Sequence, residues 1–165
     1  MKIECINVDE DMYSVQQVVK NAFSSTSDSS INEWFSFNEM INQIKMGRGV
    51  CVKAISEDGT TIGMTYAQQE NPINGREGLE KWVIVLAAVD PGSASQGVGS
   101  LLLKEIEQQA LQKSAIKMFV YTNSDDDRVI HFYKKNGYED AGWIKDYQYG
   151  SGNSAVFLLK NLKSS

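Results

Sequence analysis

A glycine- and serine-rich segment stands out, because it directly follows the most apolar run of the chain. The apolar run covers residues 82–89, and residues 91–100 read PGSASQGVGS. A helical pattern of apolar residues starts at Val98, so this segment opens a helix. The first N–H groups of a helix lack partners and lie at the positive end of the helix dipole. Because Gly97 and Gly99 have no Cβ, a phosphate could approach these groups. The sequence therefore predicts an anion site.

The glycine segment also allows two alternatives to this anion site. A turn out of a strand can require glycine with no ligand involved. The segment could also hold a nucleotide, although it has neither the GK[ST] ending of a Walker loop nor the GxGxxG spacing of dinucleotide-binding proteins.

The elements that position this segment follow from the spacing of apolar residues. Alternating or continuous apolar runs predict strands at residues 2–8, 49–56, 60–69, 82–89, 116–122, 138–149 and 154–162. Apolar residues three and four apart predict helices at residues 10–23, 31–46, 98–112 and 125–136. The order is βααβββαβαββ, which predicts an α/β (α+β) fold with one mixed sheet and helices on both faces.

The composition predicts a single domain over residues 1–165. The chain is 42% hydrophobic and 22% charged, which is the globular range, and it has neither an internal repeat nor a low-complexity linker. No apolar run reaches the roughly 18 residues of a membrane span, and the N-terminus lacks the apolar middle of a secretory signal. The net charge of −5 argues against nucleic acid as a partner.

Neither cysteine nor histidine forms a pattern that predicts a metal site. Cys5 and Cys51 stand alone in strand-like segments and are expected to be buried, reduced thiols of a cytoplasmic protein. His131 is the only histidine, and a solvated or capping role is expected for it rather than catalysis.

The glycine segment belongs to a longer series of motifs. In chain order these are Val89-x-Pro91, Gln96-Gly97-Val98-Gly99-Ser100, a strand ending in Asn123, Phe132-Tyr133, and Asn136-Gly137-Tyr138. This series resembles the GNAT superfamily of acyl-CoA-dependent N-acetyltransferases. The motifs lie between residues 82 and 138, and the order of elements agrees over nearly all of the chain.

The resemblance implies a mostly antiparallel central sheet and a binding site for acetyl-CoA as co-substrate. The main chain of Ala87, Ala88 and Val89 would pair with the pantetheine arm where this strand splays from its neighbour. Asn123 would hydrogen-bond the same arm. The main-chain N–H groups of one loop would hold the pyrophosphate, and the residues of that loop are Ser95, Gln96, Gly97, Val98, Gly99 and Ser100.

One position departs from the family pattern, which usually has Arg or Gln three residues before the first glycine. That position is Ala94, and no Lys or Arg occurs between residues 83 and 103. A charge-assisted hydrogen bond is worth ~1.5–3 kcal/mol, so CoA is expected to bind roughly ten- to a hundredfold more weakly than in relatives with Arg. The residues that could compensate are Gln96, Arg128, Lys134 and Lys135.

Tyr133 is the predicted catalytic residue, because the resemblance places it near the thioester sulfur. It would donate a proton to the leaving thiolate. The alternative is a helix aromatic that packs on the sheet beside Phe132. No residue has a supporting pattern as the general base, although Glu33, Glu70 and Glu80 are available.

Aromatic residues are the candidates for the acceptor pocket. Trp34, Tyr66 and Trp82 are predicted substrate residues, and Tyr121, Tyr147 and Tyr149 could line the same pocket. Each could instead be an ordinary core or strand residue.

The function expected from the resemblance is transfer of the acetyl group of acetyl-CoA to a primary amine of a small molecule or peptide, by direct attack in a ternary complex. The alternative is a catalytically silent acyl-CoA-binding or sensing module. The expected acceptor is an amine, no nucleic acid, membrane or metal is expected to take part, and a homodimer is possible.

Overall fold

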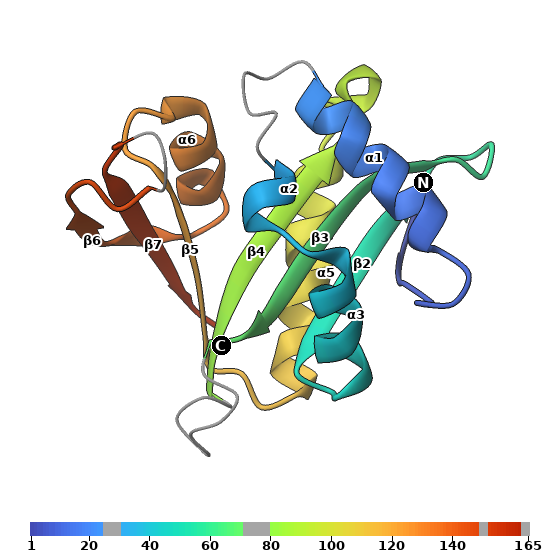
Figure 1. The fold of residues 1–165 in the computed structure, drawn as a ribbon, viewed down its shortest axis with the longest axis horizontal. Helices are drawn as coiled ribbons and strands as arrows, with labels where there is room; N and C mark the ends of the chain where they lie inside the picture. Colours follow the sequence, from blue (N-terminus) through green and yellow to red (C-terminus); the bar gives the residue numbers. More distant parts are fainter. Residues whose placement is uncertain (25–30, 71–79, 149–151, 163–165) are drawn as a thin grey trace.

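The computed structural model describes residues 1–24, 31–70, 80–148 and 152–162. Its strands are β1 (Lys2–Cys5), β2 (Gly49–Ile55), β3 (Thr61–Gln69), β4 (Lys81–Val89), β5 (Lys117–Asn123), β6 (Glu139–Ile144) and β7 (Ala155–Asn161). They form one sheet in the order β1-β2-β3-β4-β5-β7-β6 (Figure 1). Only β4 and β5 are parallel neighbours. The expected mixed, mostly antiparallel sheet is therefore confirmed.

Helices cover both faces of this sheet. They are α1 (Met12–Ser24), α2 (Ile31–Trp34), α3 (Phe37–Lys45), α5 (Val98–Gln112) and α6 (Asp127–Lys135), and a short 3₁₀ turn, η1, spans Pro91–Ser93. Figure 1 shows α1, α2 and α3 in front of β2, β3 and β4, with α5 behind these strands. The fold class expected from the sequence is therefore confirmed.

Residues of β4 pack into the core on both faces of the sheet, as its continuous apolar run predicts, although Ala87 is exposed. Trp82 and Ile84 belong to the core cluster that contains the apolar side of α5. Leu86 and Ala88 belong to the second core cluster, under α1 and α3. The side changes because β4 carries a bulge, in which Val85 has no partner in β3.

The pairing between β4 and β5 stops after three residues. The parallel register joins Lys81 to Lys117, Trp82 to Met118 and Val83 to Phe119, and no later residue of β4 pairs with β5. Figure 1 shows the two strands diverging from this point as a V. Residues 84–89 of β4 therefore present their main-chain groups to a gap in the middle of the sheet.

Two expectations about local structure were wrong. The helix predicted at residues 31–46 is two helices, because Ser36 adopts an extended conformation and its side chain caps α3 by accepting a hydrogen bond from the Glu39 N–H. Cys51 is buried but Cys5 is exposed, because β1 is a short strand at the edge of the sheet and pairs only with β2.

Candidate active site

The chain leaves β4 through a rigid turn. Asp90 caps η1 by accepting a hydrogen bond from the Gly92 N–H at 3.1 Å, and Asn21 of α1 donates to the other carboxylate oxygen at 3.3 Å. Two residues then take positive φ values, +68° at Ser95 and +78° at Gly97. Glycine is needed at the second of these because it is the N-cap of α5 in a left-handed conformation. The capped turn at Asp90 and the positive φ values of Ser95 and Gly97 reverse the chain direction, so that α5 starts near the end of β4.

The main-chain N–H groups of the loop are available to a ligand. Within the described part of the chain, none of the N–H groups of residues 95–100 donates a hydrogen bond, and the first amide of α5 that does so is Leu101, to the Gly97 carbonyl at 3.2 Å. Gly97 offers no side-chain cap either. Ser95, Gln96 and Gly97 are exposed, and Gly99 and Ser100 are partly exposed. The predicted anion site thus has unpaired donors at a helix start.

Three residues at the end of β4 lie beside this loop on the open side of the strand. Ala87 is exposed although both of its neighbours in the chain are more buried, and Ala88 is buried. Val89 packs against the core cluster of α5 and lies near Gly99. The exposed Ala87 shows that solvent reaches this central strand at its end.

Tyr133 lies in the core rather than on the surface. Its side chain is 4% exposed, and its ring packs edge-on against Phe132 and Tyr138 at centroid distances of 5.0 and 5.3 Å. No described residue hydrogen-bonds its hydroxyl. Burial raises the pKa of the Tyr133 hydroxyl above its ordinary value. The hydroxyl therefore keeps its proton and can only donate it.

Asn123 is the last residue of β5 and lies opposite Ala155 of β7. Its main-chain carbonyl accepts from the Asp126 N–H at 3.0 Å, whereas its side-chain amide has no partner among the described residues. The amide is thus free to bind a ligand in the gap.

The cations that could compensate for Ala94 differ in their present contacts. Lys134 is 2.9 Å from Asp140 of β6, so its charge already has a partner. Arg128 and Lys135 are exposed and make no ion pair with a described residue. Gln96 is exposed within the loop itself. Arg128, Lys135 and Gln96 therefore have no competing partner among the described residues, unlike Lys134.

The three predicted substrate residues lie in different environments. Trp82 is fully buried in the core cluster of α5, and Tyr66 is 1% exposed with its hydroxyl donating to Gln68 at 2.6 Å. Trp34 is 45% exposed, and its ring packs edge-on against Phe23 and Phe35. Only Trp34 offers an open surface in this structure.

Two half-exposed tyrosines from distant parts of the chain come together with two phenylalanines. Tyr121 and Tyr147 are 5.3 Å apart between ring centroids, and both contact Phe157, which lies beside Phe119. Sequence reasoning named these tyrosines, and also Tyr149, which lies outside the described residues, but missed Phe119 and Phe157. The alternation of Phe119 with Tyr121 along one strand was the signal that could have placed them on one face.

The general base is not identified by the structure. Glu70 is exposed at the end of β3, Glu80 is partly exposed just before β4, and the side chain of Glu33 lies outside the described residues. His131 is exposed on α6, as expected for a solvated residue.

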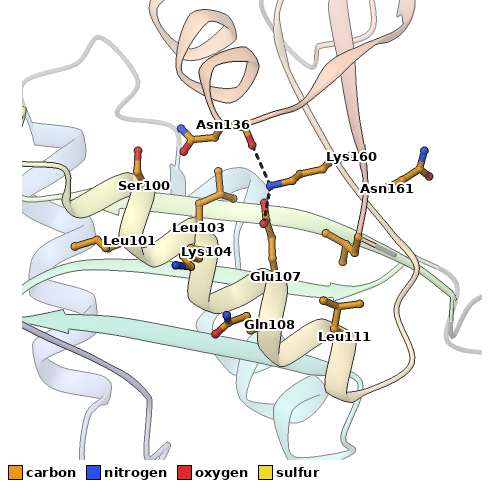
Figure 2. Close-up of a pocket in the computed structure, with 11 residues that line it drawn as sticks. Ser100, Leu101, Leu103, Lys104, Glu107, Gln108, Leu111, Asn136, Lys160 and Asn161 are labelled. Atoms are coloured by element: carbon orange, nitrogen blue, oxygen red, sulfur yellow. Dashed lines mark hydrogen bonds and ion pairs between the residues drawn. The ribbon is translucent and has the colours of Figure 1, made fainter. Parts of the chain in front are cut away.

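A groove of about 620 Å³ runs along α5 on the side of β7 (Figure 2). Lys160 of β7 crosses its floor and pairs with Glu107 of α5 at 2.8 Å, while also donating to the Asn136 carbonyl at 3.0 Å. Tyr138 donates to the other Glu107 oxygen at 3.1 Å. Every charged atom of this set is satisfied, so the network joins α5, α6 and β7 rather than offering a free catalytic group. The groove reaches the glycine loop only at Ser100.

No group of three or more His, Cys, Asp or Glu side chains suited to a metal ion occurs in the described part of the chain. Among the same residues, no helix is both long and apolar enough to cross a membrane.

Comparison with known proteins agrees with this architecture. The chain shares its fold with an aminoglycoside 6'-N-acetyltransferase complexed with coenzyme A (TM-score 0.76, 16% identity, 100% of this chain and 99% of that one). It also shares it with the ribosomal-protein-alanine N-acetyltransferase of Brucella melitensis (TM-score 0.79, 17% identity, 98% and 99% covered). The third is the yncA protein of Salmonella typhimurium, solved with its cofactor acetyl-CoA (TM-score 0.80, 14% identity, 100% and 95% covered).

Sequence comparison identifies the family directly. No curated protein sequence matches the chain. The family model described as "Acetyltransferase (GNAT) family" matches residues 11–138, which span every motif from the end of β4 to Tyr138. The resemblance seen in the sequence is confirmed, and the chain belongs to the acetyltransferase (GNAT) family.

Proposed function

We propose that the protein is an acetyl-CoA-dependent N-acetyltransferase that acts on a primary amine. The observation that carries this proposal is the gap between β4 and β5, which opens beside a loop of unpaired N–H groups. Family membership and the three similar structures support it. Acetyl-CoA would supply an acetyl group activated as a thioester.

The residues present fit a ligand with a long polar arm and a diphosphate. The main chain of Ala87, Ala88 and Val89 could offer strand-like hydrogen bonds along the gap. Asn123 ends β5, and its side-chain amide, which has no partner among the described residues, would bind the same ligand. The loop N–H groups of residues 95–100 would hold the diphosphate at the start of α5.

Two groups of the chain would act in the chemical step. Main-chain N–H groups of β4 near Ala87 would stabilise the negative charge that develops on the carbonyl oxygen. As the amine nitrogen bonds to the carbonyl carbon and the C–S bond breaks, the Tyr133 hydroxyl would give its proton to the departing sulfur, and the proton lost by the nitrogen would restore the phenol. The ordinary pKa of a tyrosine lies about 1.5 above that of a thiol, so proton transfer to the thiolate is uphill in water. Burial disfavours the phenolate and the thiolate alike and raises both pKa values, so the dry site need not widen this difference.

Two glycine variants test the role of the loop. Gly97 and Gly59 have φ values of +78° and +86°, and a Cβ on either would meet no atom within 4 Å, so Gly97→Ala and Gly59→Ala carry similar backbone costs. Gly59 lies in the hairpin between β2 and β3, far along the chain from the loop. We expect Gly97→Ala to raise the Kd for CoA about tenfold and Gly59→Ala to leave it unchanged. Equal effects of the two variants would remove the loop from the CoA site.

Release of free thiol from acetyl-CoA, measured with a panel of amines, tests the reaction. Thiol release that depends on the amine supports the transferase. CoA binding without turnover on any amine would favour the silent acyl-CoA-binding module instead.

A further inference from the structure

A wall of four aromatic rings lies next to the gap between β4 and β5. Phe119 and Tyr121 come from β5, Phe157 from β7, and Tyr147 from the turn after β6. The ring centroids of Tyr121, Tyr147 and Phe157 are 5.2–5.6 Å apart, and Phe119 lies 6.4 Å from Phe157. We call these four residues the aromatic wall.

The register of the strands fixes the face on which the wall lies. Met118, Val120 and Leu158 point into the core cluster shared with α5 and α6. Since strand residues alternate between faces, Phe119, Tyr121 and Phe157 point to the other face. Phe119 pairs with Val83, the last residue of β4 that pairs with β5. The wall therefore begins where the gap opens, on the side away from α5.

The wall is open to a ligand. Tyr121 and Tyr147 are 41% and 45% exposed, and no described residue hydrogen-bonds either hydroxyl. Burial, and then the neighbouring Tyr147, raise the pKa of Tyr121, so that its hydroxyl stays a neutral donor. Tyr147 packs edge to face on Tyr121 and Phe157. Rings that already pack on one another lose little conformational freedom when a ligand binds.

The strand face around the open end of the wall carries no charged residue. The strand positions that share this face at the open end are Asn123, Ala155, Gly142 and Ile144, and none is charged. Charged residues lie close to the wall in sequence: Lys117 before Phe119, Asp125, Asp126 and Asp127 after Asn123, and Lys145 and Asp146 before Tyr147, while Glu139 pairs in register with Leu159. The strand positions beside the two tyrosines therefore offer a ligand ring contacts rather than ion pairs.

A second aromatic surface lies on the other side of the gap. Trp34 of α2 is 45% exposed and packs on Phe23 and Phe35. Figure 1 shows α2 over β4, on the margin that faces the gap. Aromatic groups thus occur on both sides of the opening.

We propose that the aromatic wall selects the acceptor, and that the acceptor is a primary amine carried on an aromatic body, an arylalkylamine. The ring of such a molecule would stack on the wall, and its amine would extend toward the gap. This inference rests on the proposed function, because it takes the gap as the place where the acetyl group is held.

The kinetic test compares ring-bearing with ring-free amines in three variants. With 2-phenylethylamine we expect kcat/KM at least tenfold above that with ethylamine or spermidine. Tyr121→Leu and Tyr147→Leu should each raise the KM for 2-phenylethylamine about tenfold, the effect of losing one aromatic contact. Neither should change the KM for acetyl-CoA. The control is Tyr13→Leu, which removes a tyrosine that is 75% exposed on α1 and should change nothing. Equal kcat/KM for the ring-bearing and ring-free amines would overturn the proposal.

A binding measurement separates this inference from the proposed function. Calorimetric titration of 2-phenylethylamine in the presence of CoA needs no turnover. The amine could bind, with a Kd that Tyr147→Leu raises tenfold, while no amine causes thiol release. That outcome would contradict the proposed transferase activity but support the wall as the amine site. Absence of binding at millimolar amine would overturn the wall. Light scattering adds a last outcome: a dimer that Tyr147→Leu dissociates would assign the wall to a second copy of the chain and also overturn it.

Discussion

Tyr133 combines a packing role with a proposed catalytic role, and one atom separates the two. Its ring contacts Phe132 and Tyr138, whereas its hydroxyl has no partner among the described residues. Removal of the hydroxyl therefore leaves the packing intact. In Tyr133→Phe we expect kcat to fall about a hundredfold, the usual contribution of a general acid.

Thermal unfolding provides the control for Tyr133→Phe. The hydroxyl has no partner among the described residues, and its oxygen is not sealed from solvent. Its removal should therefore change stability little, and the melting temperature should stay within about 2 °C of the wild type. A variant with unchanged kcat would leave Tyr133 with its packing role alone.

Sequence motifs revealed the main-chain part of the site better than its side-chain part. A loop that binds through N–H groups needs glycine at a residue such as Gly97, whose φ of +78° few other residues tolerate, so the pattern is visible in the letters. Tyr121 and Tyr147 lie 26 positions apart in number and meet only because β5 and β6 flank β7. The burial of Tyr66 and Trp82 could not be predicted from the sequence either, because an aromatic residue in a strand can face the core or the solvent.

At the scale of elements, the break between α2 and α3 depends on Ser36. Its hydroxyl accepts from the Glu39 N–H at 3.2 Å and so satisfies one of the unpaired donors of α3. We expect Ser36→Ala to lower the free energy of unfolding by about 1 kcal/mol, seen as a melting temperature about 2–4 °C lower. Ser36→Asp should keep the wild-type value, because a carboxylate caps equally well. Equal losses in both variants would mean that the cap does not matter.

The same break shows why element boundaries were the weakest predictions. Apolar spacing continues from Trp34 through Phe37 to Met40, so periodicity alone suggests one helix. The capping hydrogen bond of Ser36 competes locally with helix continuation. Phe35, just before this cap, packs on Tyr66 and Phe37, and such contacts between distant residues are not visible in the spacing. The bulge at Val85 was unpredictable for a similar reason, since all residues of β4 around it are apolar.

A buried ion pair fastens the start of α1 to β2. Lys53 lies 2.6 Å from Asp11, with Glu4 at 3.4 Å. Burial alone would raise the pKa of Asp11 and lower that of Lys53, but their contact outweighs it, so the pKa of Asp11 is lowered and that of Lys53 is raised.

The direction of these pKa shifts sets the pH dependence. The stabilisation that Asp11 contributes to the fold is present above its unfolded pKa of about 4 and is lost as the pH falls through its lower folded pKa. The stabilisation that Lys53 contributes is present below about pH 10.4, its unfolded pKa, and is lost as the pH rises through its raised folded pKa. At pH 7, Asp11→Asn should cost about 1–3 kcal/mol in urea unfolding. That difference should shrink below pH 4.

The control for Asp11→Asn is Glu57→Gln, which removes an exposed carboxylate with no partner among the described residues and should match the wild type at every pH. A loss for Asp11→Asn that is the same at pH 7 and pH 3 would contradict the ionic origin of the effect.

At the scale of the whole molecule, the sheet has one weak point, the junction of β4 and β5, whose strands pair only where the gap between them begins. Three residue pairs join β4 to β5, and the Glu107–Lys160 pair links α5 to β7 behind them. A ligand that fills the gap and bonds to both strands would connect the two halves of the sheet. Its binding energy therefore adds to the stability of the fold as a whole.

This linkage predicts the effect of acetyl-CoA on unfolding. At a concentration one hundred times its Kd, the ligand should stabilise the protein by about 2.7 kcal/mol, which corresponds to a melting temperature about 5–10 °C higher. The free N–H groups at the start of α5 could also donate hydrogen bonds to the phosphates of other nucleotides, so ATP and NAD serve as controls. Since neither has a pantetheine arm to fill the gap, each should give a much smaller shift than acetyl-CoA. Hydrogen exchange adds a local measurement, since residues 84–89 of β4 should become protected only when the arm of the ligand lies in the gap. A shift with ATP or NAD as large as that with acetyl-CoA, without protection of these residues, would instead favour a nucleotide-binding protein that uses the loop alone.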